Sequence, residues 1–464
     1  MQFRFCFLVL VSLILISCGG KDASDELDSD ADGVVDSLDA FPNNPNETLD
    51  SDGDGIGDNS DSSPFGTDGT TSSNGSVLSL PSVPFGYSEI ELPEHYTTNF
   101  FPETFAFQRA AVELDNEPAN NVVTDEGATL GRVLFYDKKL SANGTKSCAS
   151  CHQQVFGFAD RNRLSVGFEG GLTARHSMAL ANNRFYLSGK YFWGERADSL
   201  EEQVLMPIQD EVEMGLTLAE LEQVVAAQSY YPSLFIAAFG DANVSSERIA
   251  DALAQFQRSM VNTQSKYDIA RLEHLSLGET DPIDDFPGFS QSENAGKRLF
   301  FLPQPVVDTE GRSLGDRVSC AGCHITEAFV GTVAPPGALR DMTDATINGL
   351  DDGSESDYDP GIGGHTGVAS DEGKFKVPSL ANIAIRPPYM HDGRFSTLEQ
   401  VIDHYSSGIK AHANLNRPLL GSNGLPVRFN FSSAETAQLV DFLETLTDQN
   451  LLTNEMWSNP FTEN

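Results

Sequence analysis

From about residue 100 onward, apolar residues recur at positions i, i+3 and i+4, which is the spacing of one face of an α-helix. Loops rich in Gly and Pro separate these segments, and no alternating pattern is long enough to predict a sheet. The pattern therefore predicts a mainly α-helical fold. The predicted amphipathic helices are Leu218–Ala227, Ser246–Val261, Ser292–Phe301, Leu398–Tyr405 and Ser433–Leu446.

The length and composition indicate a loop-rich chain with more than one core. At 464 residues the chain exceeds what one compact core usually holds, so we expect two domains and a non-globular extension. Hydrophobic residues make up 39% of the chain and charged residues 21%, which is typical of a soluble protein and not of one embedded in a membrane. The segment Asp281–Pro287 is the expected domain boundary.

The chain is strongly acidic, with a formal net charge of −39 at pH 7. Phosphate binding needs a basic face, so this charge argues against a nucleic-acid partner and favours cationic partners. The acidity is concentrated near the start of the chain, because residues 19–70 contain 15 acidic residues and one lysine.

Residues 1–18 have the pattern of a targeting segment. Arg4 supplies a positive start, residues 5–16 form an apolar run, and Leu15-Ile16-Ser17-Cys18 ends the segment. The tetrad resembles a bacterial lipobox, which would make Cys18 the lipidated first residue of an exported protein. We therefore expect a periplasmic lipoprotein with a lipid anchor in a membrane, at the outer membrane or the cell surface. The alternative is an ordinary signal peptide with an incidental Cys.

Residues 19–66 contain an acidic repeat with a period of 22 residues. Alternate Asp carboxylates around a Gly that permits a sharp turn suit a hard cation such as Ca²⁺. The tract resembles thrombospondin type 3 repeats, which implies calcium binding, and the alternative is a solvated, disordered spacer. Residues 67–98 are the expected linker. The candidate calcium ligands are Asp28, Asp30, Asp32, Asp36, Asp39, Asp50, Asp52, Asp54, Asp58 and Asp61.

Two copies of the pattern Cys-x-x-Cys-His lie in the helical part of the chain. This pattern attaches c-type haem, because two thiols on one turn reach the two vinyl groups and the next imidazole binds the iron. A redox-active Cys-x-x-Cys or a zinc site would leave the His of both copies unexplained. We therefore predict two covalent c-type haems. Their ligands are Cys148, Cys151 and His152 for the first haem, and Cys320, Cys323 and His324 for the second.

Short segments around the two motifs follow one family pattern in chain order: Leu130–Phe135, Gly157–Asp160, Phe192–Trp193, Phe256–Asp268, Val377–Asn382 and Pro388–Gly393. With them, residues 105–446 resemble the bacterial di-haem cytochrome c peroxidase and MauG family. The resemblance implies two cytochrome c-like domains, an N-terminal peroxidatic domain at 99–286 and a C-terminal electron-transfer domain at 287–464. It also implies an enzyme that uses hydrogen peroxide, with an electron donor or a protein substrate as its partner.

The resemblance places Gln203 and Glu213 in the distal pocket of the first haem, opposite His152. Cleavage of a bound peroxide needs one proton to move from the near to the far oxygen, and a buried carboxyl group can carry it. From the residues alone, Glu213 would be a carboxylate at the start of a helix.

Trp193 matches the tryptophan that family members hold between the two haems, where an aromatic ring relays electrons. It is one of two Trp in the chain, and its spacing alone would make it a core residue. The sequence Phe192-Trp193-Gly194-Glu195-Arg196 departs from the family's usual Phe-Trp-Asp-Gly-Arg, which puts the turn geometry in question.

Two features separate subfamilies of the resembling proteins. In members that need reductive activation, a His in a Gly-rich loop caps the first haem. Here the loop Ser165–Ala174 contains no His, so we expect an open first iron unless His176 caps it. At the second haem, Tyr405 lies in the region where MauG-like enzymes have a Tyr ligand. A phenolate lowers the potential of the iron and a thioether raises it, and Met390 is the rival ligand.

Family members also bind one Ca²⁺ between the domains, through an Asn side chain and two backbone carbonyls. The positions in this chain that match are Asn182, Arg386 and Pro388. The alternative for Asn182 is an ordinary turn residue.

Three functions remain open from the sequence. The leading hypothesis is MauG-like oxidation of a side chain of a protein substrate, driven by peroxide and favoured by Tyr405 and the His-free loop. The second is a detoxifying cytochrome c peroxidase that receives electrons from a small cytochrome c or a copper protein. The third is a non-enzymatic di-haem electron carrier, which predicts two six-coordinate haems that do not react with peroxide.

Overall fold

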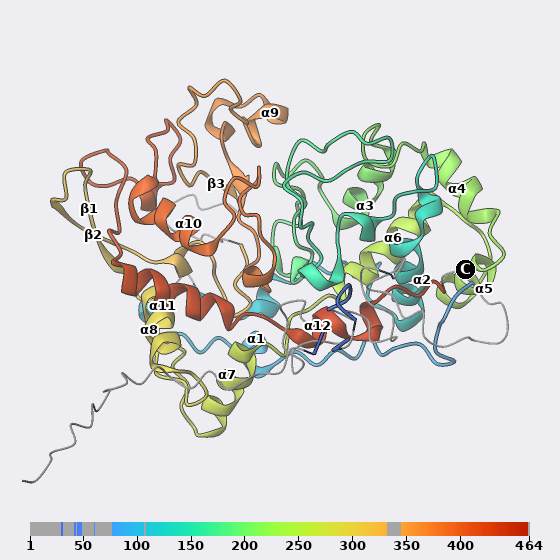
Figure 1. Cartoon of the computed structure of the whole chain (residues 1–464), viewed down its shortest axis with the longest axis horizontal. Coiled ribbons are helices and arrows are strands. Elements are labelled where there is room, and N and C mark those ends of the chain that lie inside the picture. Colours follow the sequence, from blue (N-terminus) through green and yellow to red (C-terminus); the bar gives the residue numbers. More distant parts are fainter. Residues whose placement is uncertain are drawn as a thin grey trace, which may run out of the picture. The chain divides into compact units, whose positions relative to one another are not determined.

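The computed structural model (Figure 1) describes residues 29–30, 41–42, 44–48, 60, 77–105, 108–331 and 345–462. Contacts between Cα atoms separate residues 1–75 from a compact unit, Ser76–Thr462, that carries both Cys-x-x-Cys-His motifs. The predicted signal peptide, Cys18 and the repeat aspartates other than Asp30 lie outside the described residues. Among the residues that are described, no helix is long and apolar enough to cross a membrane.

The compact unit is mainly helical, as the hydrophobic pattern predicts. The five predicted helices are confirmed as α4 (Leu218–Ala226), α6 (Ser246–Arg258), α8 (Gln291–Phe301), α10 (Leu398–Asp403) and α11 (Ser433–Glu444). The other helices are α1 (Glu94–Thr97), α2 (Asp125–Tyr136), α3 (Leu200–Gln209), α5 (Tyr231–Phe239), α7 (Lys266–Ser276), α9 (Gly363–Thr366) and α12 (Gln449–Thr453).

Most of these helices begin at a Ser or Thr that satisfies the free N–H groups of the first turn. Four of them have a full capping box, in which an acidic side chain three residues later binds back to the cap: Thr217 with Glu220, Ser265 with Asp268, Ser290 with Glu293, and Ser432 with Glu435. Helix α10 ends earlier than predicted, because the backbone widens into a π-helical turn at His404–Gly408 that contains Tyr405.

Two small sheets differ from the prediction that no sheet forms. Strands β1 (Gln304–Val307) and β2 (Ser313–Val318) pair antiparallel, with an irregularity in the register between Pro305 and Val307. Strands β3 (Ala345–Thr346) and β4 (Phe375–Lys376) form a second antiparallel pair. The strands are too short, and β2 is too exposed, to give a clear alternation of apolar and polar residues.

The compact unit contains two lobes built to the same plan. We call the core around α2–α6 the first lobe and the core around α7, α8, α10 and α11 the second lobe. In the first lobe α2 packs on α6, and in the second lobe α8 packs on α11 (Figure 1). In both lobes the first helix of the pair also contacts the turn that begins the Cys-x-x-Cys-His motif.

Each helix pair crosses at a glycine. A Cβ atom on Gly131 would lie 1.9 Å from the carbonyl oxygen of Ala252, and one on Gly296 would lie 1.8 Å from that of Gln438. The two glycines also share their next contact. Phe256 lies next to Gly131 and Phe442 lies next to Gly296, each one helical turn after the residue whose carbonyl is contacted. The absence of a side chain therefore lets the two backbones of each pair touch.

In each helix pair, an asparagine side chain binds the backbone just after the second helix. Asn182 and Asn382 both have positive φ, at 63° and 55°. The Oδ1 atom of Asn182 accepts the N–H of Asn262 at 2.8 Å, just after α6, and that of Asn382 accepts the N–H of Asp448 at 2.7 Å, just after α11. The two lobes thus share both the helix crossing and its anchor.

A third apolar cluster contains residues from both lobes, including Phe185, Val261 and Ile325.

Residues 77–98 were predicted to belong to a linker, but they pack on the rest of the compact unit. Tyr87 and Tyr96 are buried, and Ser79 donates its N–H to the carbonyl of Pro460 at 2.8 Å. Their aromatic side chains hold this segment in place.

We predict that Gly131→Ala and Gly296→Ala each lower the free energy of unfolding. Alanine gains about 1 kcal/mol in helix propensity. Overpacking usually costs about 1–3 kcal/mol, and a Cβ atom this close to a backbone oxygen belongs at or above the upper end, which leaves a net loss of about 2 kcal/mol or more. Urea unfolding of the haem-loaded proteins measures this loss.

The matched control is Gly86→Ala, where the nearest atom to the added Cβ is 3.5 Å away. This variant should stay within about 0.5 kcal/mol of the wild type. A Gly131→Ala protein as stable as the control would contradict the proposed backbone contact.

Candidate active site and haem attachment sites

A cavity of about 810 Å³ opens beside the first Cys-x-x-Cys-His motif. Its size is in the range of cofactor and ligand pockets. It brings together the residues predicted for the first haem, because its lining includes Cys148, Cys151, His152, Trp193, Gln203 and Glu213. The second lobe contributes part of the same lining, including Asp359, Gly361 and Lys376.

The first motif folds as a tight turn that presents its three ligands together. Residues Cys148–Ser150 form a 3₁₀ turn, and the N–H of His152 donates to the carbonyl of Cys148 at 2.9 Å. The Nδ1 atom of His152 lies 3.0 Å from the carbonyl oxygen of Phe158. Because that carbonyl can only accept, Nδ1 carries the proton and Nε2 keeps the lone pair that a metal needs.

The electrostatics of this motif suit haem attachment and not thiol redox chemistry. Burial raises the pKa of the Cys148 thiol to about 12 and that of Cys151 to about 11. A redox-active Cys-x-x-Cys needs a lowered pKa. Burial also lowers the pKa of His152, which keeps the imidazole neutral for metal binding. The donor set and the cavity therefore fit a covalently attached haem.

Glu213 and Gln203 lie on the same cavity wall. Gln203 belongs to α3, while Glu213 lies in a turn before α4 and not at a helix start. Burial raises the pKa of Glu213, the nearby carboxylate of Asp210 raises it further, and Arg196 opposes both. The charge of Glu213 in turn raises the pKa of both Cys148 and Cys151, so its carboxyl group is close to the haem-attachment thiols.

The His-free loop packs directly against the segment that carries Glu213. A Cβ on Gly167 would lie 1.7 Å from the carbonyl oxygen of Val212, and Phe168 donates its N–H to the carbonyl of Glu213 at 3.2 Å. Only glycine permits this approach. The loop therefore fixes the backbone position of Glu213, the predicted distal carboxylic acid.

His176 also lines the cavity, although its polar contacts hold it to its surroundings. Its Nδ1 atom lies 3.1 Å from the carbonyl oxygen of Asn162, and its own N–H donates to the carbonyl of His391 in the second lobe at 2.8 Å. Its carbonyl accepts the indole N–H of Trp193 at 2.8 Å. The open first iron, with His176 as the alternative cap, stays a prediction.

Trp193 lies between the cavity and a segment of the second lobe. Its ring meets the ring of His391 edge-on, with centroids 6.4 Å apart, and its carbonyl accepts the N–H of Lys376 at 2.9 Å. The unusual sequence Phe192–Arg196 around it forms a turn in which Phe192 and Glu195 have positive φ, at 69° and 50°. The Gly194 that replaces the usual Asp faces Arg175, whose Nη1 would lie 2.8 Å from an added Cβ.

The second motif repeats the geometry of the first. Residues Cys320–Gly322 form a 3₁₀ turn, and His324 donates its N–H to the carbonyl of Cys320 at 3.0 Å. Burial lowers the pKa of His324 to about 4, against the opposing effect of the Pro378 carbonyl, and raises that of Cys323 to about 11. This donor set also fits haem attachment.

Both candidate sixth ligands of the second haem lie around one asparagine. Asn348 Nδ2 donates to the phenolic oxygen of Tyr405 at 3.4 Å and lies 3.8 Å from the sulfur of Met390. Burial raises the pKa of Tyr405 to about 12, and the hydrogen bond from Asn348 opposes this. Cys323 and Cys320 raise it as well, so the phenol lies beside the second motif.

The three residues predicted for an inter-domain calcium ion lie in two places. Asn182 is buried, and its Nδ2 donates to the carbonyl of Ala328 in the second lobe at 3.3 Å. Arg386 is also buried, with its guanidinium bound to the carbonyls of Ala381 and Ser379. The ion and its coordination by Pro388 stay predictions.

One contact at the cavity was not predicted from the sequence. Arg175 in the first lobe binds Asp359 in the second through two hydrogen bonds of 2.7 Å, and its charge lies over the ring of Phe375. Asp359 also lies 3.9 Å from the imidazole of His391. This pair closes the wall of the cavity between the lobes, and nothing local in the sequence connects residues 184 positions apart.

Comparison with known proteins identifies the relatives of the chain. The family described as di-haem cytochrome c peroxidase matches residues 125–274. The methylamine utilization protein MauG of Methylorubrum extorquens is 32% identical over 332 residues, which are 71% of this chain and 80% of that protein. The cytochrome c551 peroxidase of Nitrosomonas europaea is 31% identical over 352 residues, or 74% of this chain and 87% of that protein.

Two solved structures share the fold. A MauG-like protein associated with microbial copper homeostasis has a TM-score of 0.60 and 32% identity, and the match covers 75% of this chain and 96% of that one. The di-haem peroxidase BthA of Burkholderia thailandensis has a TM-score of 0.52 and 21% identity, over 72% of this chain and 88% of that one.

The fold and the first cavity define a di-haem peroxidase, an oxidoreductase that acts on peroxide. The chain belongs to the di-haem cytochrome c peroxidase and MauG family. Its cofactors are accordingly two haems, and it needs an electron donor or a protein substrate besides peroxide. Membership of this enzyme family argues against the non-enzymatic electron carrier.

We predict that Gly167→Ala lowers kcat/KM for hydrogen peroxide by about 10-fold to 100-fold, because the added methyl group displaces the backbone next to Glu213. Covalent haem content, measured by the absorption of the pyridine complex, should not change. The matched control is Gly170→Asn in the same loop, where nothing lies within 4 Å and Asn tolerates the φ of 87°. Equal activity of the two variants would contradict a positioning role for the loop.

Proposed function

We propose that the protein is a MauG-like di-haem peroxidase that uses hydrogen peroxide to oxidise a side chain of a protein substrate, with Tyr405 as the sixth ligand of the second haem. The observation that carries this proposal is the position of Tyr405, whose phenolic oxygen lies beside the second Cys-x-x-Cys-His motif. The absence of His from the loop Ser165–Ala174 supports an open first iron.

The bound haems supply the redox centres at which peroxide is reduced. The protein supplies the proton transfer. Glu213 would accept a proton from one oxygen of a bound peroxide and return it to the other oxygen, which would leave as water. The two electrons for cleavage of the O–O bond would come from the haems, for which the two Cys-x-x-Cys-His motifs supply the ligands. Gln203, on the same wall of the cavity, orients the peroxide by hydrogen bonding. The raised pKa of Glu213 makes its carboxylate a stronger base, which favours the first half of this transfer, in which it accepts the proton.

Trp193 carries electrons between the two halves of the enzyme in this proposal. Its ring lines the first cavity and contacts His391, one residue from Met390 in the second lobe. The hydrogen bonds of Trp193 with His176 and Lys376 hold the ring in this position. A fixed aromatic ring shortens each step of an otherwise long electron transfer.

The remaining parts of the proposal concern the whole chain. A peroxidatic domain at 99–286 and an electron-transfer domain at 287–464 would each hold one haem. Attachment of c-type haem outside the cytoplasm supports export, with Cys18 as a lipid anchor. The buried Asn182 at the contact of the lobes supports the inter-domain calcium ion, and calcium in the repeats rests on their spacing alone.

A second candidate is a detoxifying peroxidase that takes electrons from a small cytochrome c or a copper protein. The position of Met390 favours it, because the sulfur shares with Tyr405 the contact with Asn348. A thioether ligand would give the second haem a higher potential, which suits a donor of that kind.

We predict that Glu213→Gln lowers kcat for peroxide turnover by about 10²-fold to 10⁴-fold, the usual contribution of a positioned acid or base. The amide keeps the shape of the side chain but cannot accept the proton. Steady-state peroxidase kinetics, with covalent haem content as the reference, measure the loss.

The matched control is Glu211→Gln, an exposed glutamate two residues earlier. The pH profile adds a second test. Glu213 acts as a base only when it is deprotonated, and its pKa is raised above 4.5, so the acidic limb of kcat/KM should lie above pH 4.5 and disappear in Glu213→Gln. A retained acidic limb would assign the proton transfer to another group.

We predict that Tyr405→Met raises the midpoint potential of the second haem, because a thioether replaces an anionic oxygen. Spectroelectrochemical titration measures the potential, and Met390→Leu is the control that should leave it close to the wild-type value. An unchanged potential in Tyr405→Met, with a changed one in Met390→Leu, would favour the detoxifying peroxidase.

A further inference from the structure

Asn348 contacts both candidate ligands of the second haem and lies two residues after the end of β3. The segment that carries Tyr405 contacts the backbone of Asn348. The Nε2 atom of His404, the residue before the tyrosine, lies 3.1 Å from the carbonyl oxygen of Asn348. The adjacent Gly349 accepts the N–H of Lys410 at 2.7 Å. An added Cβ on Gly349 would lie 2.5 Å from Ile409, so the two segments are in direct contact.

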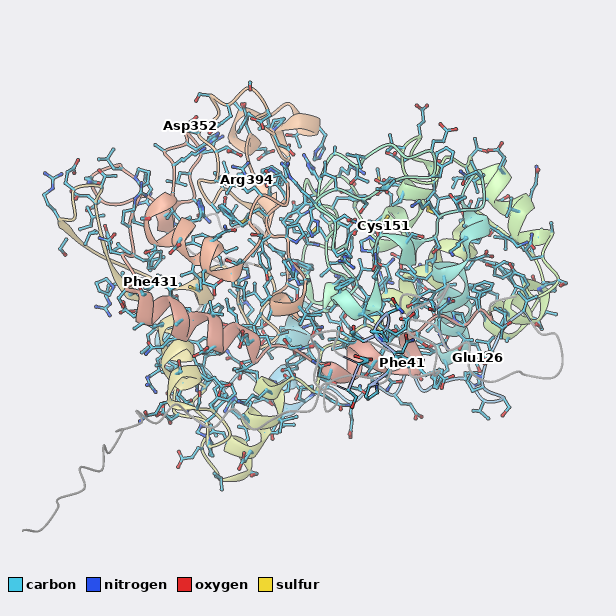
Figure 2. All side chains as sticks on the ribbon, in the orientation of Figure 1. Phe41, Glu126, Cys151, Asp352, Arg394 and Phe431 are labelled. Atoms are coloured by element: carbon cyan, nitrogen blue, oxygen red, sulfur yellow. The ribbon has the colours of Figure 1, made fainter. Side chains whose placement is uncertain are left out.

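The segment that carries Asn348 is also bound by the segment that carries Met390. Arg394, which is labelled in Figure 2, lies four residues after Met390. It binds both carboxylate oxygens of Asp351 at 2.8 Å and also binds Asp392 at 2.8 Å. The φ of Met390 itself is positive, at 75°, which fixes the direction in which its side chain leaves the backbone. Asn348 is therefore placed relative to both ligands by contacts that do not involve a metal.

The orientation of the Asn348 amide follows from its hydrogen bonds. Its Oδ1 atom accepts the N–H of Leu350 at 3.2 Å, so the amide nitrogen must face the other way. That nitrogen donates to Tyr405 at 3.4 Å and approaches the sulfur of Met390 at 3.8 Å. A nitrogen with two N–H groups serves both atoms, and in both cases the ligand atom is the acceptor.

We propose that Asn348 is a positioning residue that selects the axial ligand of the second haem. Its amide stabilises the anionic oxygen of Tyr405 by a hydrogen bond to a charged acceptor and engages a lone pair of the Met390 sulfur. Hydrogen bonds of this kind orient metal ligands and tune the metal. This inference rests on the proposed ligation of the second haem by Tyr405. It assigns to Asn348 the preference of the iron for the phenolate over the adjacent thioether of Met390.

The experiment compares Asn348→Asp and Asn348→Leu in the haem-loaded, full-length protein. Aspartate keeps the side-chain oxygen that accepts the N–H of Leu350, but it replaces the amide nitrogen, a donor, with an oxygen, an acceptor. Leucine removes both the oxygen and the nitrogen at nearly constant side-chain volume. The electron paramagnetic resonance and charge-transfer absorption of the oxidised protein distinguish tyrosinate from thioether ligation. Potentiometric titration gives the midpoint potential.

We expect both variants to lose tyrosinate ligation in favour of a thioether, with at least a tenfold shift of the reduction equilibrium toward the reduced haem, or about 59 mV for one electron. Adding Met390→Leu should remove the thioether signal from each variant. Met390→Leu alone should keep the wild-type tyrosinate spectrum, which makes it the matched control.

A measurement on the wild type keeps the test independent of folding. Exchange of the amide protons for deuterons should shift the iron–tyrosinate stretch in the resonance Raman spectrum, because the phenolate oxygen accepts one of them. No shift, or Asn348 variants with an unchanged tyrosinate spectrum and potential, would overturn the inference and leave the proposed function intact. A wild type with no tyrosinate signal would instead refute the Tyr405 ligation of the proposed function.

Discussion

The contact on which the rest of the structure depends is the crossing of two helices at a glycine, which occurs once in each lobe. At Gly131 and at Gly296 the backbone of one helix touches a carbonyl of its partner, and no side chain could be inserted there without displacing one of them. Helices α2 and α8 also contact the turns that carry Cys148 and Cys320. The crossings therefore set the position of each predicted haem-attachment turn relative to its lobe, which a flexible motif could not do by itself.

The two lobes share this scaffold but place different residues beside their Cys-x-x-Cys-His motifs. Beside the first motif the chain leaves a cavity of about 810 Å³ with the carboxyl group of Glu213 in its wall. Beside the second motif it places a phenol, a thioether and an amide around Asn348. An open pocket lined by a carboxyl group suits reaction with a small oxidant, and candidate axial ligands beside the second motif suit a haem that stores or transfers electrons.

The sequence was sufficient where the information is local. The Cys-x-x-Cys-His turns and the helices with Ser or Thr caps form as their own residues dictate, and the helical fold class was correct. The recurrence of Leu-Ala-Asn at 180–182 and 380–382 would also have revealed the duplicated anchor, since Asn182 and Asn382 make the same contact. Long-range contacts gave no such signal: Arg175 pairs with Asp359 only because the lobes meet there, and Asn348 follows a two-residue strand that no periodicity predicts.

The contact between the lobes explains how two separate haem sites can act as one enzyme. Trp193 comes from the first lobe, yet its carbonyl and its ring are held by Lys376 and His391 of the second. The ion pair of Arg175 with Asp359 spans the same contact, and it is only partly exposed, so solvent screens it less than a surface pair. In the proposed mechanism, the same few residues close the first cavity and hold the ring of Trp193, which carries electrons out of it. A shift at the contact between the lobes would then alter peroxide access and electron transfer together, which would couple the two steps.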